Sequence, residues 1–548
     1  MWVPGAAEGG EWTAGKTIPR RCSDPTCRTE VMELKEPDGN EWKYHGEGNR
    51  SLVVSHVQHC QVLRFLKFPI ELPQPNKALE EVPHRLNNIV EFSKHVMKPL
   101  LGDNFVQPGE VIQLPLDFVR QLALKIQQER PGSRCNKVMD VFSGYTLCLP
   151  DLTKFQTSHH IEKRPPLCIE IKPKCGFIPF SSHITKEIKR RVCRYCMHQH
   201  LKVANGKWKK MSKYCPLDLF SGNKQRMCIA LKSLLQEPQN NLKIFKNGEL
   251  IFGCKDDQDC LMDLNELANH LKAYFFPTNG VVNGPQCIRT VITELIQVIT
   301  MALLSTPADS CRTGDMKRTR ISEEMSQCEA SQFRRDVLRN NIHSVENSGL
   351  PNGSVLSQIL QVQMLDMMDI DGIYPLYLRV QQHLEEFPKD RSRLHLDGPY
   401  DESFYESLSD FSQDDETVDY AARKIHQYRV ATTAKDCSIM IALSPCLLEE
   451  RPEPSSIIRT SRTSFAYSIS ILDLDPKPYE NIAHQYKLDG KIINYYLQNT
   501  RTKKDVTNPN VYRGYEECTL FFHSVNTTSD FKISQDTGLL TLLEKQYI

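Results

Sequence analysis

The chain has 548 residues, of which 40% are hydrophobic and 25% are charged, and its 68 Lys and Arg residues nearly balance 67 Asp and Glu residues. This composition excludes a wholly disordered chain and a uniformly basic nucleic-acid-binding protein. The apolar stretch 291–304 contains Glu294 and is shorter than the roughly 18 residues that a membrane span needs. The N-terminal residues lack the apolar core of a secretory signal. We therefore expect a protein of the cytoplasm and nucleus without a membrane-spanning helix.

Residues 1–39 are rich in Gly, Pro and charged residues without an apolar period, which predicts a flexible N-terminal extension. Two alternating, β-branched runs then flank the sequence HGEGN at residues 45–49, a pattern typical of an antiparallel hairpin. Between residues 77 and 130 the apolar spacing lengthens to that of helices, and GYTLCLPDL returns to a strand-like pattern. These features predict an α+β N-terminal lobe over residues 40–153.

Residues 154–499 are expected to form a larger C-terminal lobe, with strongly apolar strands at DCSIMIAL and SFAYSISILDLD. Within this lobe, residues 306–353 are polar with scattered Gly, Pro and Ser, which predicts a mobile insertion. Residues 162–213 hold 14 Lys/Arg against three acidic residues, a local charge of +11 that indicates a polyanionic ligand. Residues 500–548 are expected to form a polar tail.

The glycine-rich sequence HGEGN places Gly46, Gly48 and Asn49 between two expected strands, where backbone N–H groups can approach phosphate oxygens. An ordinary hairpin turn has the same pattern, so this signal is weak by itself. Arg64 interrupts an apolar strand in VLRFLK. It is either a surface residue or the cation that kinases hold opposite a glycine-rich loop.

Two pairs of charged residues suggest phosphate chemistry. EIKPK places Lys172 and Lys174 on one face of an extended segment, with Pro173 between them; the alternative is a solvent-facing pair at a strand end. Asp436 and Asp473 lie at the edges of apolar strands, either as turn caps or as functional acids. Phosphoryl transfer needs one acid to accept or orient the proton of the attacking hydroxyl and another to bind Mg²⁺, so these two residues satisfy that need.

Eight segments carry a resemblance to a known family: HGEGN, VLRFLK, CIEIKPKCGF, MHQHLK, CPLDLFSG, PQNN, AKDCSIMIAL and LDLDPKP, in this order. They resemble the inositol-pentakisphosphate 2-kinases, which use ATP to make inositol hexakisphosphate (phytate) from the 1,3,4,5,6-pentakisphosphate. The resemblance implies a two-lobed inositol polyphosphate kinase-like fold, with an antiparallel N-lobe sheet, a larger mixed C-lobe and ATP between them. The chain lacks the HRD and DFG triplets of protein kinases and the P-x-x-x-D-x-K-x-G motif of other inositide kinases.

The resemblance also implies roles for individual residues. Lys172 would contact the transferring phosphate, Asp436 would be the base for the 2-hydroxyl, and Asp473 would bind Mg²⁺ beside ATP. The remaining ATP contacts would come from Gly46, Gly48, Asn49, Arg64 and a hinge at the adenine that includes Leu149 and Asp151. The inositide would be bound by Lys172 together with Arg130, Lys174, Lys202, Asn240, Asn241 and Lys477.

A cysteine-rich cluster predicts a structural Zn²⁺ site. Cys193, Cys196, His200 and Cys215 lie within 23 residues, in a combination of C-x₂-C, a nearby His and a more distant Cys that fits zinc ligation. Free thiols in a helix are the alternative, because Cys215 lies a long loop away.

A second class of function stays open, namely a non-catalytic zinc module that binds RNA through the basic stretch 162–213. Such a module needs exposed aromatic side chains for base stacking, and this stretch offers few besides Tyr195 and Trp208. It would also leave the glycine-rich sequence and the acidic strand ends unexplained. We therefore favour a monomeric enzyme that binds ATP and the inositide and no nucleic acid.

Overall fold

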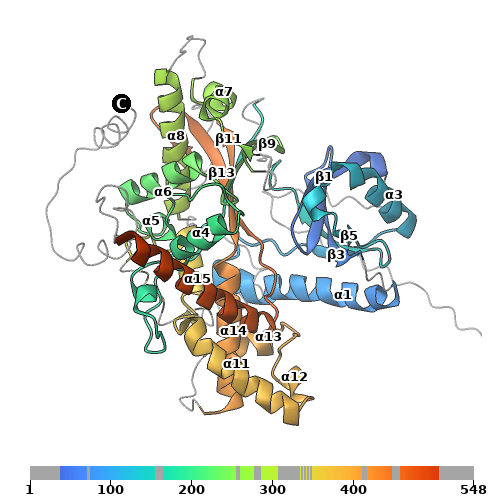
Figure 1. Ribbon diagram of the computed structural model, residues 1–548. Helices are drawn as coiled ribbons and strands as arrows, with labels where there is room; N and C mark the ends of the chain where they lie inside the picture. Colours follow the sequence, from blue (N-terminus) through green and yellow to red (C-terminus); the bar gives the residue numbers. More distant parts are fainter. Residues whose placement is uncertain are drawn as a thin grey trace, which may run out of the picture.

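The computed structural model describes residues 38–70, 75–154, 164–254, 260–276, 285–306, 348–409, 416–446 and 457–504, with separate positions between 334 and 345. The predicted terminal extensions therefore lie largely outside the described residues. Two antiparallel sheets, one built from strands between residues 42 and 150 and the other from strands between residues 167 and 472, carry helices around them (Figure 1). The α+β, two-lobed fold class predicted from the sequence is confirmed.

The N-lobe sheet has the strand order β1-β2-β3-β6-β4, and β5 pairs with β3. Its helix α3 (Leu116–Ile126) buries Phe118 and Leu122, four residues apart on one helical face, in one cluster with Trp42. The predicted hairpin around HGEGN is formed by the first two strands. The strands are β1 (Trp42–Glu47), β2 (Ser51–His56), β3 (Gln61–Pro69), β4 (Glu110–Gln113), β5 (Lys137–Met139) and β6 (Tyr145–Pro150).

One helical run lies against both lobes, below the N-lobe sheet in Figure 1. It consists of α1 (Pro75–Glu91), the π-helical segment η2 (Phe92–Met97) and α2 (Lys98–Leu101). Leu86 packs with side chains of the first sheet, whereas Val96 and Leu100 are fully buried in the C-lobe core. This run therefore couples the two lobes by apolar burial as well as by chain connection.

The C-lobe sheet has the order β10-β9-β8-β7-β11-β13-β12. Its central strands are almost wholly apolar because helices cover them, and they coincide with the segments predicted as strands. The strands are β7 (Leu167–Ile171), β8 (Leu242–Lys246), β9 (Glu249–Cys254), β10 (Cys260–Leu261), β11 (Ser438–Pro445), β12 (Ile457–Arg459) and β13 (Ser464–Leu472).

Helices surround this second sheet, and those at the bottom of Figure 1 form a separate apolar cluster between α11, α14 and α15. The described α-helices of the C-lobe are α4 (Arg194–Ala204), α5 (Pro216–Leu219), α6 (Lys224–Gln236), α7 (Leu264–Phe275), α8 (Pro285–Leu304), α10 (Val355–Gln363), α11 (Asp369–Glu386), α12 (Asp390–Arg393), α13 (Glu402–Glu406), α14 (Val418–Ala434) and α15 (Asn481–Lys504).

Helix α8 is long and apolar enough over Gln286–Leu304 to cross a membrane by composition alone. More than half of this window is buried inside the protein, however, and Leu295 and Ile299 belong to the C-lobe core. It is therefore a core helix, longer than the apolar stretch that the sequence suggested.

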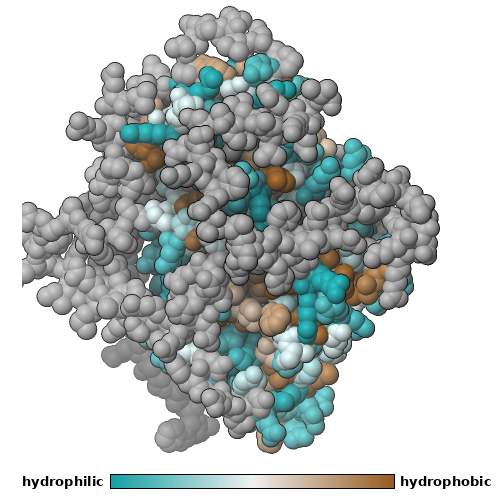
Figure 2. Space-filling view, turned by 90° about the vertical axis from the view of Figure 1, so that its left-hand side faces the viewer, coloured by the Kyte–Doolittle hydropathy of each residue, from teal (hydrophilic) through white to brown (hydrophobic). Residues whose placement is uncertain are grey.

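On the face shown in Figure 2, the coloured hydrophobic residues stand in small groups between hydrophilic ones.

Two expectations about the C-lobe need correction where residues are described. Leu338, Val345 and Leu350, all within the predicted mobile insertion, are at most 5% exposed and belong to the core. In the sequence, polar residues surround these apolar residues, so no helical apolar period could be recognised there. Helix α15 also continues to Lys504, past the predicted end of the lobe at residue 499.

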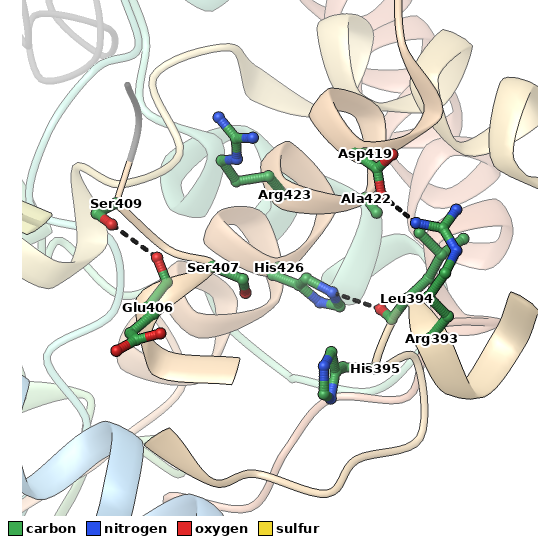
Figure 3. Close-up of a pocket in the computed structure, with 10 residues that line it drawn as sticks. All are labelled: Arg393, Leu394, His395, Glu406, Ser407, Ser409, Asp419, Ala422, Arg423 and His426. Atoms are coloured by element: carbon green, nitrogen blue, oxygen red, sulfur yellow. Dashed lines mark hydrogen bonds and ion pairs between the residues drawn. The ribbon is translucent and has the colours of Figure 1, made fainter. Parts of the chain in front are cut away.

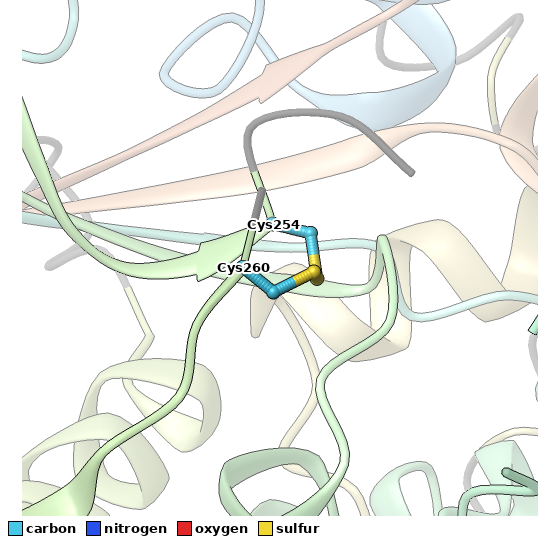
Figure 4. The surroundings of a disulfide bond; sticks show 2 residues. All are labelled: Cys254 and Cys260. Atoms are coloured by element: carbon cyan, nitrogen blue, oxygen red, sulfur yellow. A yellow bond between two sulfur atoms is a disulfide. The ribbon is translucent and has the colours of Figure 1, made fainter. Parts of the chain in front are cut away.

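A short-range disulfide joins Cys254 and Cys260 across β9 and β10 (Figure 4). The antiparallel register places these two residues directly opposite each other, with their Cα atoms 4.0 Å apart. The bridge closes a separation of six residues, so it is a local link between neighbouring strands.

Candidate active site

The predicted catalytic residues meet at one edge of the C-lobe sheet. Lys172 follows β7, Asp436 lies two residues before β11, and Asp473 follows β13. Because β7 and β13 both run antiparallel to β11, their last residues lie beside its first residues. The sheet topology thus brings together Lys172 and Asp473, which are 301 positions apart in the sequence.

Lys172, Ser438 and Asp473 form a hydrogen-bonded group at this edge. The Lys172 ammonium donates to the Asp473 carboxylate and, over 2.7 Å, to Ser438 Oγ, which itself lies 2.8 Å from Asp473 Oδ2. Burial opposes both charges, but Asp473 and Glu170 raise the pKa of Lys172 above its usual value, and Lys172 holds the pKa of Asp473 well below its usual range. Both groups are therefore charged at neutral pH.

The Asp473 carboxylate is open to solvent although the lysine beside it is not. Its side chain is 51% exposed, against 20% for Lys172. Its backbone has a φ of +63°, in the left-handed region, a strained conformation that structures tend to keep at functional positions. An accessible carboxylate backed by a hydroxyl presents the hard oxygen ligands that Mg²⁺ prefers, so this residue fits the predicted metal role.

Asp436 lies between two lysines that the sequence assigned to the inositide. Lys174 Nζ is 3.3 Å from Asp436 Oδ1, and Lys477 Nζ is 3.1 Å from Oδ2. Burial works against the charged carboxylate, but these two cations lower the pKa of Asp436 below its usual value. The Asp436 side chain is 58% exposed, so a ligand can reach both it and its lysines.

The glycine-rich turn borders open space. A Cβ atom added at Gly46 or Gly48 would meet no protein atom within 4 Å, so these glycines are not required by internal packing. Arg64 connects the same sheet to the catalytic edge: its Nη1 donates to Asp475 Oδ1 over 2.7 Å and its Nε to Ser51 Oγ over 3.0 Å. An open glycine-rich turn with an arginine reaching the other lobe fits a bound polyphosphate chain.

The predicted hinge connects the N-lobe sheet to the rest of the chain. Leu149 pairs with Val62 of β3. The Asp151 carboxylate accepts hydrogen bonds from the backbone N–H of Thr153 (3.0 Å) and its Oγ1 (2.6 Å), and lies 3.5 Å from Lys154 Nζ. The Asp151 side chain is therefore used locally, and contact of this segment with adenine stays a prediction.

Arg130 is not among the residues that meet at the sheet edge, so its predicted contact with the inositide stays a prediction. Its Nε and Nη2 donate to Glu47 Oε1 and Oε2 over 2.8 and 2.9 Å, and its side chain is only 2% exposed. The buried Glu47 carboxylate requires a cationic partner, and this requirement was invisible in the sequence.

The two asparagines of PQNN have different surroundings. Asn240 is exposed, whereas Asn241 is 1% exposed, donates to the hydroxyl of Tyr195 (2.9 Å) and accepts from the backbone N–H of Lys172 (2.9 Å). A buried amide pair, Gln239 Nε2 to Gln199 Oε1 at 3.1 Å, ties the same segment to α4. The sequence argument missed both glutamines, although each lies in a motif that carried the resemblance.

Only part of the basic stretch 162–213 is available to a ligand. Lys189 is paired with Asp369 and Asp489 and is 4% exposed. The pKa of Lys202 in α4 is lowered to about 8. Burial is the main cause, and the nearby positive charges of Lys174 and Lys207 add to it. Lys202 and Lys174 thus repel each other, and an anion bound between them would relieve this repulsion.

This shift predicts a pH dependence of inositide affinity. Lys202 loses its proton as pH rises through about 8, so polyphosphate binding should weaken above that pH and stay strong below it. Lys202→Arg keeps the charge to high pH and should remove the Lys202 contribution to the decline. Titration calorimetry with the pentakisphosphate between pH 7 and 9.5 measures the effect, and identical declines in both proteins would contradict it.

Three of the four predicted zinc ligands converge. The Sγ atoms of Cys193, Cys196 and Cys215 all lie within 4.8 Å of one another and are buried. His200 is outside this group, and its ring packs edge-on against Tyr496, so its role as the fourth ligand stays a prediction. The cluster lies at the N-terminal end of α4, where Cys193 is the capping residue, and His200 follows Cys196 by one helical turn on the same face.

The two aromatic side chains that the alternative of RNA binding relied on are buried. Tyr195 and Trp208 are each 8% exposed, and the hydroxyl of Tyr195 is engaged with Gln239. Neither ring is available for base stacking. The basic stretch therefore offers lysines for phosphates, whereas Phe180, 82% exposed, is its single exposed Phe, Tyr or Trp side chain among the described residues 164–213.

A separate cavity of about 550 Å³ lies beside α12, α13 and α14 (Figure 3). Arg393 is paired there with Asp419 over 2.6 Å, and His426 Nε2 lies 2.9 Å from Leu394 O. Asp419 thus compensates the charge of Arg393 at this cavity. None of the predicted site residues lines this cavity.

Two lobes, an open glycine-rich turn on one of them, and lysine–aspartate pairs at a sheet edge of the other define a two-lobed phosphotransferase. A sequence profile of the inositol-pentakisphosphate 2-kinase family matches residues 44–491, and the chain belongs to this family. It is 58% identical over 496 residues to the inositol-pentakisphosphate 2-kinase of Danio rerio, covering 90% of this chain and 100% of that protein. The enzymes of Oryza sativa subsp. indica and Arabidopsis thaliana are 28% and 26% identical, covering 87% and 85% of this chain and 98% and 95% of their own lengths.

Proposed function

We propose that this chain transfers the γ-phosphoryl group of ATP to the 2-hydroxyl of inositol 1,3,4,5,6-pentakisphosphate, giving inositol hexakisphosphate and ADP. The observation that carries the proposal is the meeting of Asp436, Asp473 and three lysines at one sheet edge. Phosphoryl transfer depends mainly on positioning and on cations around the transferred group, and this edge supplies cations beside two accessible carboxylates.

On the nucleotide side, the turn at Gly46, Gly48 and Asn49 would bind phosphate oxygens through backbone N–H groups, with Arg64 as a fork. Lys172 would move its ammonium from Asp473 toward the transferring phosphate. A Mg²⁺ ion held by the Asp473 carboxylate would supply charge neutralisation between the phosphates. The location of these residues on opposite lobes supports a nucleotide between them.

On the inositide side, Lys174, Lys202 and Lys477 would bind phosphate groups of the substrate. When the phosphates attract Lys174 and Lys477, Asp436 loses the cations that lower its pKa, and its carboxylate becomes a better base for the 2-hydroxyl proton. The substrate would thus help to activate the group that deprotonates it.

The reaction is tested with radiolabelled ATP and the pentakisphosphate, with products separated by anion-exchange chromatography. We expect label in inositol hexakisphosphate. The matched control is a pentakisphosphate that already carries the 2-phosphate, which should accept little label. Equal labelling of both substrates, or none of either, would overturn the proposed reaction.

We also propose that Cys193, Cys196 and Cys215 hold a structural Zn²⁺ ion as thiolates. The distance of 3.9 Å between Cys193 Sγ and Cys215 Sγ is close to the roughly 3.8 Å that a tetrahedral site with Zn–S bonds of about 2.3 Å requires. The backbone N–H of Cys196 also points at Cys193 Sγ over 3.4 Å. Three thiolates leave one position of the tetrahedron for His200, the fourth predicted ligand, and free buried thiols are the alternative outcome.

Replacing two of these thiolates tests the zinc site. Cys193→Ser with Cys196→Ser should lower bound zinc from about one equivalent to none and lower stability by more than the ~1 kcal/mol typical of a point change. Cys228→Ser, a half-buried cysteine outside the cluster, is the control and should keep its zinc. Elemental analysis measures the metal, and wild-type protein purified without chelators that contains no zinc would contradict the proposal.

A further inference from the structure

The glycine-rich turn contains a buried carboxylate. Glu47, between Gly46 and Gly48, has a side chain that is 0% exposed, although a polar residue in a hairpin turn ordinarily faces solvent. Lys67 of β3 forms an ion pair with Glu47 Oε2, and the hydroxyl of Tyr44 lies 3.4 Å from Oε1. A charged group buried so completely fixes the backbone that carries it, because moving the turn would separate the charge from its partners.

Arg130 holds this carboxylate in a two-pronged contact, with its Nε and Nη2 2.8 and 2.9 Å from the two oxygens. Such forks fix orientation as well as distance. The same Nη2 also donates to the carbonyls of Arg134 (3.0 Å) and Lys137 (2.7 Å). Arg130 therefore ties Glu47 to the whole segment 130–137.

That segment holds the other end of the turn as well. Lys137 Nζ donates to both the carbonyl and the side-chain oxygen of Asn49, each over 3.0 Å. The carbonyl of the next residue, Arg50, accepts from the backbone N–H of Lys67 over 2.9 Å. Glu47 and Asn49 are thus anchored on both sides of Gly48 by side chains from one segment.

We propose that segment 130–137 is a brace that positions the glycine-rich turn for nucleotide binding, with Glu47 and Arg130 as its main positioning pair and Lys137 as its second anchor. The inference rests on the proposed role of the turn in binding the phosphates of ATP. It gives Arg130 a function on the nucleotide side of the enzyme and none in direct contact with the inositide.

The charges of the brace suit this role. Burial opposes ionisation of Glu47, but the hydrogen bonds from Arg130 and Lys67 lower its pKa below the usual value, so the pair persists over the pH range in which the enzyme works. Two cations against one carboxylate leave a net charge of +1 beneath the turn. That excess favours phosphate oxygens above it, in the space that Gly46 and Gly48 leave open.

The test separates nucleotide affinity from inositide affinity. Titration calorimetry measures Mg–ADP binding without inositide and pentakisphosphate binding without nucleotide. We expect Glu47→Gln and Arg130→Lys each to weaken Mg–ADP binding about tenfold or more, with pentakisphosphate affinity changed less than twofold. Lys137→Met removes only the partly exposed anchor on Asn49, so it should keep the melting temperature while still weakening Mg–ADP binding several-fold.

Lys125→Met is the matched control, because Lys125 Nζ also donates to backbone carbonyls near β1, at Gly39, Asn40 and Trp42, but at the end of the strand away from the turn. It should leave both affinities unchanged. Unchanged Mg–ADP affinity in Lys137→Met and Arg130→Lys would overturn the brace while leaving the proposed reaction intact. A larger loss for the pentakisphosphate than for Mg–ADP would return Arg130 to the inositide site. Wild-type protein that binds no Mg–ADP would remove the proposed function and the brace together.

Discussion

Asp473→Asn should lower kcat by about a thousandfold, since a metal ion at the transferred phosphate contributes several kcal/mol of charge stabilisation. The amide keeps the volume and one oxygen near Ser438, but it removes the negative charge that faces Lys172. The pKa of Lys172, which Asp473 now raises, should fall in the variant. Both changes act on the step of phosphoryl transfer, so the loss should appear in kcat.

The controls for this variant follow from its position. The Asp473 side chain is half exposed, so the melting temperature and the affinity for the pentakisphosphate should change little. Asp419→Asn, which alters a carboxylate paired with Arg393 in the remote cavity, should keep normal turnover. Wild-type kcat in Asp473→Asn, measured at saturating substrate and Mg²⁺, would remove this residue from the metal site.

The strands and the residues at their ends could be predicted because both leave local signals. β11 contains an uninterrupted apolar run from Ile439 to Leu443, and β13 alternates apolar residues with serines before it ends at Leu472. An acidic residue next to such a strand stands out in the sequence. The motifs then gave the residues an order along the chain. What the motifs do not contain is the register that places Ile439 opposite Ile171 and Ser438 opposite Leu472, which brings the strand ends together.

The contacts that could not be predicted involve residues whose partners lie far away in the sequence or off the local period. Cys215 joins Cys193 and Cys196 from 19 or more residues further along the chain, so the spacing within α4 alone could not show that the three thiols meet. Arg130 looked like a free cation because nothing in the sequence shows that Glu47 is buried. In the insertion, Leu338 and Val345 are core residues whose polar neighbours mask any amphipathic pattern.

The pH dependence of turnover should report the release of Asp436 from its lysines. In the free enzyme Lys174 and Lys477 hold the pKa of Asp436 below its usual value, so the carboxylate is already ionised in mildly acidic solution. Bound phosphates draw these lysines away, so the pKa should rise in the complex with substrate. A base works only when ionised, and the rate therefore falls as pH drops through its pKa. The acidic limb of kcat should thus lie at a higher pH than the limb that Asp436 contributes to kcat/KM.

Asp436→Asn removes the base and should lower kcat by about 10²–10⁴-fold. The acidic limb of kcat/KM can come from Asp436 or from the phosphates of the free substrate, which titrate in the same range. The pH profile of the residual activity of Asp436→Asn separates these two sources. A limb that remains in Asp436→Asn belongs to the substrate, and the part that disappears belongs to the carboxylate. Lys477→Met offers an independent check: with one cation gone, the Asp436 limb of kcat/KM should move to higher pH, toward the limb of kcat. If kcat keeps its acidic limb unchanged in Asp436→Asn, the group that titrates in the complex is not this carboxylate, and another acceptor for the 2-hydroxyl proton must be sought at the same sheet edge.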